Sequence, residues 1–133
     1  MKRHVLCLVL SMCAFKAFAG QGGSLIEQAP AKAQAASNPL AGSTKASRAG
    51  AKLFDRECSA CHGRSAQGIG KAPSLISTDV SAAPAGALFW VLRNGSVRRG
   101  MPSFAHLPEP QRWQIITYLQ TLQLDRDLFA LNQ

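Results

Sequence analysis

Two cysteines and a histidine stand within five consecutive residues of this chain, Cys58-Ser59-Ala60-Cys61-His62. Two thiols at this spacing can each form a thioether with one of the two vinyl groups of a porphyrin, and the histidine that follows can reach the iron. Imidazole is a ligand that suits iron. The pattern is typical of covalent c-type haem attachment. A small domain has a marginal core, so we expect the haem to supply much of that core and its attachment to be coupled to folding.

The first 19 residues have the pattern of a cleaved export signal. A positive start, Met1 to His4, precedes a short apolar run from Val5 to Phe15, and Ala17-Phe18-Ala19 fits the A-x-A cleavage pattern. The run is about half of the ~20 residues that a membrane span needs, which favours cleavage over a retained anchor. We therefore expect an exported, periplasmic protein cut before Gly20. A lipidated Cys13 and a short buried core helix are the weaker alternatives.

Removal of residues 1–19 narrows the choice of a second iron ligand. The remaining chain contains a single methionine, Met101, and one histidine besides His62, which is His106. Met101 stands in the sequence Gly-Met-Pro, and these neighbours indicate a shaped loop. Thioether and imidazole form a standard pair for a six-coordinate haem, so the sequence favours Met101 as the second ligand. The alternatives are that Met101 fills an apolar core, or that His106 or another group takes the position.

Three stretches are predicted to form helices. Serine and threonine are good N-caps, Asn-Gly is a strong helix stop, and proline fits the first helical turn. On these signals the helices are Ser43 or Thr44 to about Glu57, about Pro84 to Arg93, and one that starts after Leu107-Pro108-Glu109-Pro110. Leu88, Val91 and Leu92 form an apolar stripe on the middle helix, widened by Phe89 and Trp90. These side chains line a haem pocket or belong to a general core.

Composition divides the rest of the chain. Residues 20–43 are rich in Gly, Ala, Ser, Gln and Pro and contain no aromatic residue, which predicts a flexible leader. The alternative is an irregular arm packed on the domain. Residues 44–124 form the predicted domain. Residues 125–133 form a tail that either extends the last helix or frays.

The chain is strongly basic, with 15 basic and 7 acidic residues and a formal charge of +8. The signal contains Lys2, Arg3 and Lys16 and no acid, so its removal leaves 12 − 7 = +5. Five basic residues flank the haem motif or Met101, and we call them the basic rim: Arg64, Lys71, Arg93, Arg98 and Arg99. Such a field steers an acidic partner, although the same residues also fit an ordinary solvated surface. Export, and the lack of a basic helix face or an aromatic stacking pattern, argue against nucleic-acid binding.

Six short motifs follow one another along residues 46–124. They are Ala49-Gly50-x-x-Leu53-Phe54, Cys58–His62, Ala72-Pro73-Ser74-Leu75, Asn94-Gly95, Gly100-Met101-Pro102-Ser103-Phe104 and Ile115-Ile116-x-Tyr118-Leu119. In order and spacing they resemble the class I, monohaem c-type cytochromes of bacterial export pathways. The resemblance implies an all-α, small cytochrome c fold, with three main helices and loops wrapped around one covalently bound haem c.

The resemblance also implies a role for particular residues. Cys58 and Cys61 would form the thioethers, and His62 and Met101 would be the axial iron ligands. The Pro73 carbonyl would accept a hydrogen bond from the other ring nitrogen of His62, which fixes the orientation and basicity of the ring. The first and last helices are expected to cross closely at Gly50 and Phe54. The apolar stripe at that crossing follows the helical i, i+3, i+4, i+7 spacing: Ile115, Tyr118, Leu119 and Leu122.

Three classes of function remain. An electron carrier without enzymatic activity or a small-molecule substrate is favoured, because six-coordinate iron leaves no open position. Its partner would be an oxidase, a quinol-oxidising complex or a dehydrogenase, and the chain could itself be the electron-accepting subunit of an exported dehydrogenase complex. A haem enzyme or sensor would need a labile sixth ligand. A redox disulfide, or a zinc site of Cys58, Cys61, His62 and His106, is the third class, but adjacent Cys61 and His62 are poorly placed to share one tetrahedral ion.

Overall fold

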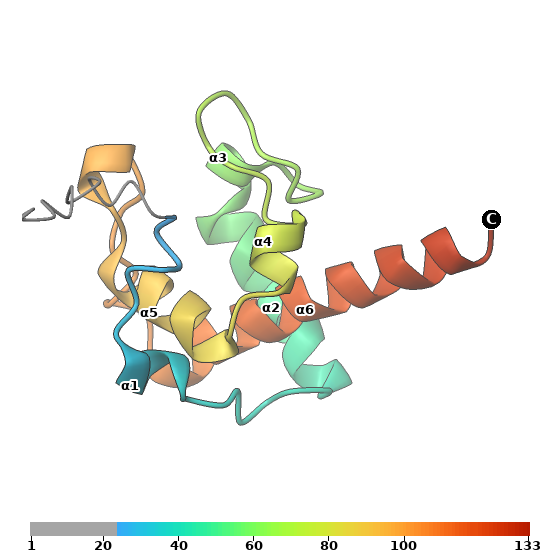
Figure 1. The fold of residues 1–133 in the computed structure, drawn as a ribbon, viewed down its shortest axis with the longest axis horizontal. Coiled ribbons are helices and arrows are strands. Elements are labelled where there is room, and N and C mark those ends of the chain that lie inside the picture. The colour runs from blue at the N-terminus through green and yellow to red at the C-terminus, as the bar shows by residue number, and fades with distance from the viewer. Residues whose placement is uncertain (1–23) are drawn as a thin grey trace, which may run out of the picture.

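A computed structural model of the chain describes residues 24–133, which form helices joined by loops (Figure 1). The helices are α1 (Ala31–Gln34), α2 (Thr44–Glu57), α3 (Ser59–His62), α4 (Thr78–Ser81), α5 (Ala85–Asn94), the 3-10 helix η1 (Val97–Arg99) and α6 (Glu109–Leu131). Within these residues there is no strand, only an isolated bridge between Ser96 and Met101. The fold is all-α, as predicted. The predicted signal, residues 1–19, lies outside the described residues.

The three predicted helices are α2, α5 and α6, and the expected signal stands at the start of α2 and α6 and at the end of α5. The Ser43 hydroxyl caps α2 by accepting a hydrogen bond from the Ala46 N–H at 3.2 Å. Helix α5 ends at Asn94, where Gly95 takes a positive φ of 63° that glycine adopts without strain. Helix α6 follows Pro108 and has a second proline, Pro110, in its first turn.

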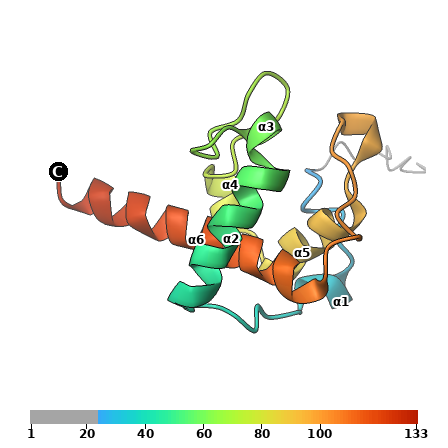
Figure 2. The ribbon, with the colours of Figure 1, turned by 180° about the vertical axis from the view of Figure 1, so that it is seen from behind.

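The core lies where α2 crosses α6, in the middle of the molecule (Figures 1 and 2). Gly50 makes the close approach possible, because a Cβ atom at this position would lie 1.9 Å from the Gln114 carbonyl oxygen. The rings of Phe54 and Tyr118 meet there with their centroids 5.4 Å apart. Phe54 and Ile115 are each only 1% exposed. The predicted crossing of the first and last helices is confirmed.

Residues 24–43 pack against the domain instead of forming the flexible leader predicted from composition. Asn38 is 9% exposed, and its Nδ2 donates to Thr117 Oγ1 at 2.9 Å and to Gln120 Oε1 at 3.0 Å. At Gly86 of α5, a Cβ atom would lie 1.9 Å from the Ala33 carbonyl oxygen of α1. Composition reflects only how little apolar surface the arm can bury, whereas hydrogen bonds and a close glycine contact hold this arm. The alternative of a packed, irregular arm describes it better.

Helix α6 continues through the predicted tail and projects beyond the rest of the domain (Figure 1). Its projecting part carries four exposed apolar side chains, Leu124, Leu128, Phe129 and Leu131. Arg126 turns back toward the domain and donates to the Ile76 carbonyl oxygen. None of the helices in residues 24–133 combines the length and apolar character needed to cross a bilayer.

Candidate functional site

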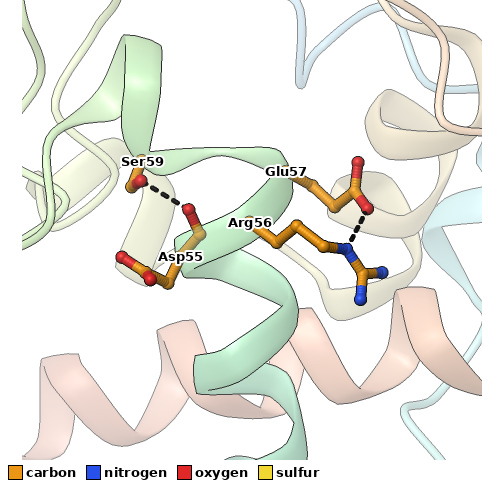
Figure 3. Close-up of polar contacts among 4 residues, drawn as sticks. All are labelled: Asp55, Arg56, Glu57 and Ser59. Carbon is orange, nitrogen blue, oxygen red and sulfur yellow. Dashed lines mark hydrogen bonds and ion pairs between the residues drawn. The ribbon is translucent and has the colours of Figure 1, made fainter.

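The Cys58–His62 segment continues almost directly from the end of α2. Cys58 joins α2 to α3, and its N–H donates to the Phe54 carbonyl at 2.8 Å, while the His62 N–H donates to the Cys58 carbonyl at 2.9 Å. The Ser59 hydroxyl donates to the Asp55 carbonyl at 2.5 Å, which ties α3 to the last turn of α2 (Figure 3). Cysteines three positions apart in one helical turn project from neighbouring points of its surface.

The two thiols of this turn are both free, but their surroundings differ. Cys58 is 8% exposed, whereas Cys61 is exposed. Burial, with smaller contributions from the charges of Glu57 and Cys61, raises the pKa of the Cys58 thiol to about 11. Cys58 is therefore protonated at neutral pH, and neither sulfur is committed to a disulfide.

His62 is buried and held by one hydrogen bond. Its Nδ1 lies 2.9 Å from the carbonyl oxygen of Pro73, the residue that the family resemblance pairs with it. A carbonyl oxygen only accepts hydrogen bonds, so Nδ1 must carry the proton, and in neutral imidazole Nε2 is then the free lone pair. A ring fixed in this tautomer presents Nε2 as a metal ligand.

The loop after α3 places Pro73 opposite His62. The Gly68 N–H donates to the His62 carbonyl at 2.8 Å, and the Leu75 N–H donates to the Ala66 carbonyl at 2.8 Å. Gly68 has a φ of +87°, and a Cβ atom there would lie 2.5 Å from the Ala72 carbonyl oxygen. The loop is therefore closed by main-chain contacts that only glycine permits at position 68.

Met101 lies in a tight loop, as its Gly-Met-Pro setting indicated. Ser96 and Met101 exchange two main-chain hydrogen bonds of 2.8 and 3.0 Å, with η1 forming the tip of the loop between them. A Cβ atom on Gly95 would lie 2.4 Å from the Pro102 carbonyl oxygen, so the two ends of the loop touch. Met101 is partly buried and packs against the core. Figures 1 and 2 place α3 and η1 on the same side of α6.

The donor set and its apolar surroundings fit a covalently attached haem. Two free thiols and an imidazole with Nε2 available are the groups that attach and ligate such a cofactor, and the Met101 thioether is a further group able to bind iron. Several apolar side chains of the loop after α3, of α5 and of the Met101 loop pack on the core but stay only partly buried: Leu75, Ile76, Leu88, Phe89 and Met101. Apolar surface left in this state suits a large flat ligand that would cover it.

The rival zinc site is not formed in the described part of the chain. His106 is exposed and contacts the ring of Phe104, with the centroids 6.0 Å apart. Within residues 24–133, no three His, Cys, Asp or Glu side chains are grouped so that they could hold a metal ion. The histidine that would complete a Cys₂His₂ set thus does not join the others.

All five members of the basic rim are exposed. Arg64 lies 3.8 Å from Asp55, a surface ion pair that is largely open to solvent. The loop that carries Arg64 and Lys71, and the η1 turn that carries Arg98 and Arg99, rise on the same side of α6 (Figure 1). The segments that carry four of the five rim residues therefore lie on the same side of α6 as α3.

Arg112 carries a buried charge that the sequence patterns did not predict. Arg112 is 7% exposed and sits in the first turns of α6. It lies three and seven positions before Ile115 and Leu119, so it occupies the apolar stripe of the last helix. A charged residue in register with a buried stripe was the available signal.

A family model described as cytochrome C oxidase, cbb3-type, subunit III matches residues 45–119. The match begins next to the first residue of α2 and ends within α6, so it spans the helix crossing, the Cys58–His62 motif and the Met101 loop. No curated protein matches the chain.

Proposed function

The chain belongs to the c-type cytochrome family described as cytochrome C oxidase, cbb3-type, subunit III, and on that premise we propose that it is an exported, periplasmic carrier of single electrons with one covalently bound haem. Haem-based electron transfer follows from the family. The location, the number of haems, the iron ligands and the partner are the proposal.

Each residue of the site has a defined task in this proposal. Cys58 and Cys61 would hold the haem as thioethers, and His62 Nε2 and the Met101 sulfur would bind its iron. When bound, the haem supplies a reversible one-electron Fe(II)/Fe(III) couple whose potential is raised by methionine–histidine ligation.

The observation that carries the proposal is the hydrogen bond between His62 and Pro73. The Pro73 carbonyl keeps the proton on Nδ1, so that Nε2 remains a lone pair, and it prevents the ring from turning. The Ser96–Met101 bridge fixes the main chain of Met101. With His62 and Met101 both bound to the iron, no open position would remain for a substrate, which supports a carrier and not a catalyst.

Intact mass and absorption spectra test this assignment. The mature chain should begin at Gly20, exceed the mass of its polypeptide by one haem, and keep that excess after extraction with acidified acetone. The ferric protein should show the weak near-infrared charge-transfer band of sulfur ligation. Extraction of the haem into the solvent, or absence of that band, would exclude covalent attachment or Met101 ligation respectively. Rapid turnover of peroxide by the protein alone would exclude the carrier function.

The basic rim supports an acidic docking face on the partner. Candidates are a terminal oxidase, which the family description names, a quinol-oxidising complex and an exported dehydrogenase. The exposed apolar side chains at the end of α6 favour a second candidate function, the electron-accepting subunit of a stable dehydrogenase complex, because exposed apolar patches mark protein contacts. Purification at high salt distinguishes these two candidate functions: a transient carrier dissociates from its partner, whereas a subunit remains bound.

A further inference from the structure

Arg112 is a buried cation next to the loop that follows Met101. It is 7% exposed, and a guanidinium stays charged under all ordinary conditions. Burying a charge is costly unless polar groups compensate it. Its partners therefore indicate what the residue does.

Among the described residues, every acceptor that the Arg112 side chain reaches belongs to one short loop. Its Nη1 donates to the Leu107 carbonyl at 2.5 Å and to the Ala105 carbonyl at 3.3 Å, and it lies 3.5 Å from the Phe104 carbonyl. The described residues give Arg112 no carboxylate partner. The charge is thus compensated by main-chain carbonyl oxygens of residues 104–107, which link the Met101 loop to α6.

The guanidinium also lies over an aromatic pair. Its Cζ lies 4.8 Å from the centroid of the Phe89 ring, and this ring stacks on Trp113 with the centroids 4.2 Å apart and the planes 21° from parallel. A cation over an aromatic face is attracted to the ring. Among the described residues, the Arg112 Nε has no hydrogen-bond partner, so the contacts to the loop are made through the end of the side chain.

The same loop is tied to α5 at its other end. The Ser103 hydroxyl donates to the Arg93 carbonyl at 2.6 Å, and the Phe104 N–H donates to the Leu92 carbonyl at 2.9 Å. Residues 103 and 104 are therefore fixed to α5, and residues 104–107 are fixed to α6 through Arg112. Residues 103–107, which begin two positions after Met101, are thus held at two points, and loss of either set of bonds would leave them held at only one.

We propose that Arg112 is a positioning residue for the Met101 ligand, and this rests on the proposed function, in which Met101 binds the haem iron. Arg112 reaches the loop carbonyls through a planar group that also lies over the Phe89 ring, and it thereby holds the main chain of residues 104–107 in place. Lysine retains the charge but lacks the planar group, so it should replace arginine only in part. Arg112 itself makes no contact with the iron.

Imidazole binding to the ferric holoprotein tests this role, since imidazole enters only when Met101 leaves the iron. Arg112→Met should bind imidazole at least tenfold faster than the wild type, and Arg112→Lys several-fold faster. Arg126→Lys is the matched control, because Arg126 is also on α6 and donates to a main-chain carbonyl, that of Ile76, which is outside residues 101–107. It should leave the rate unchanged.

Heating provides a second readout that a merely structural role would not move. In both Arg112 variants the near-infrared sulfur band should disappear at a lower temperature than the helical circular dichroism. The proposal would be overturned if both Arg112 variants bound imidazole at the wild-type rate, or if Arg126→Lys accelerated imidazole binding as much as they do. It would also be overturned if the sulfur band disappeared only at the temperature at which the helices unfold. If Arg112→Met does not fold, Arg112→Lys decides between these outcomes. A wild-type protein without the sulfur band would refute Met101 ligation, and the role of Arg112 with it, before any variant is compared.

Discussion

Replacing Gly50 by alanine should destabilise the protein although alanine favours helices. The added Cβ would lie 1.9 Å from the Gln114 carbonyl oxygen and 2.5 Å from the carbonyl carbon. Real Cβ contacts stay at or above 3.0 Å, so α2 and α6 must separate locally by at least 3.0 − 1.9 = 1.1 Å. Both atoms belong to helix main chains that a change of rotamer cannot move aside.

The size of the effect follows from two opposed contributions. Overpacking costs about 1–3 kcal/mol, and a clash between main-chain atoms belongs at the upper end of this range. Alanine in place of glycine inside a helix returns roughly 1 kcal/mol. The net loss in the free energy of unfolding is about 2 kcal/mol. For a domain of this size, that loss corresponds to a fall in the melting temperature of roughly 8–16 °C.

Gly86→Ala is the comparison variant, because it creates the same steric overlap at a place where the neighbouring chain can move away. Its Cβ would also lie 1.9 Å from a carbonyl oxygen, that of Ala33, but Ala33 belongs to the N-terminal arm and not to the helix crossing. The arm can move away, so we expect less than half of the Gly50→Ala loss, together with faster proteolysis before residue 43.

Thermal unfolding of the holoproteins, followed by far-ultraviolet circular dichroism, measures both effects. Because the haem is covalent, its loss should not complicate the transitions. A Gly50→Ala melting temperature within about 2 °C of the wild type, or above it, would refute the reasoning, since the helices would then tolerate a Cβ at their crossing.

Four other perturbations have defined outcomes. Met101→Ala should abolish the near-infrared sulfur band, lower the reduction potential and admit small ligands; an unchanged spectrum would point to another ligand. Reversing the charges of Arg98 and Arg99 should slow stopped-flow electron transfer with an anionic iron complex without a matching change in potential, and the difference should vanish as salt screens charges beyond about 8–10 Å; rates indifferent to salt would count against the docking face. Asn38→Ala should cost about 1–3 kcal/mol of unfolding free energy and release the arm to proteases, because it leaves buried partners unpaired; an arm that stays protected would argue against the hydrogen bonds as its anchor. Ser43→Ala should cost about 1 kcal/mol and Ser43→Gly only a few tenths in thermal unfolding, as for other N-caps; equal losses would mean that the hydroxyl does not cap α2.

Much of the fold could be predicted because its signals are local. The Ser43 cap, the Asn94-Gly95 stop and Pro108 set the ends of helices through bonds and torsions within a few residues. The i, i+3, i+4, i+7 spacing of apolar residues on α6 identified the face that packs against α2. The family resemblance placed the crossing at Gly50, and the structure gives the reason, since glycine permits main chains to touch there.

The arm and the end of α6 were harder to predict. The arm has little apolar surface, and composition gives no information about whether Asn38 finds acceptors 79 and 82 residues further along the chain. Helix α6 continues beyond the domain, and the leucines of this part are exposed and not buried against the core. The arm depends on partners that are distant in sequence, and the end of α6 has an apolar surface that the described residues 24–133 leave exposed.

The sequence by itself determined the chemistry of the site, because Cys58, Cys61, His62 and Met101 carry the only sulfur and imidazole groups, apart from His106, in residues 20–133. The tertiary structure decided which of these groups are restrained and by what. It set the Pro73 carbonyl against His62, left His106 on the surface, and placed the buried charge of Arg112 against the loop after Met101. The physical reason is that a residue type fixes which bonds an atom can form, whereas burial and the direction of a hydrogen bond exist only once distant segments have packed together.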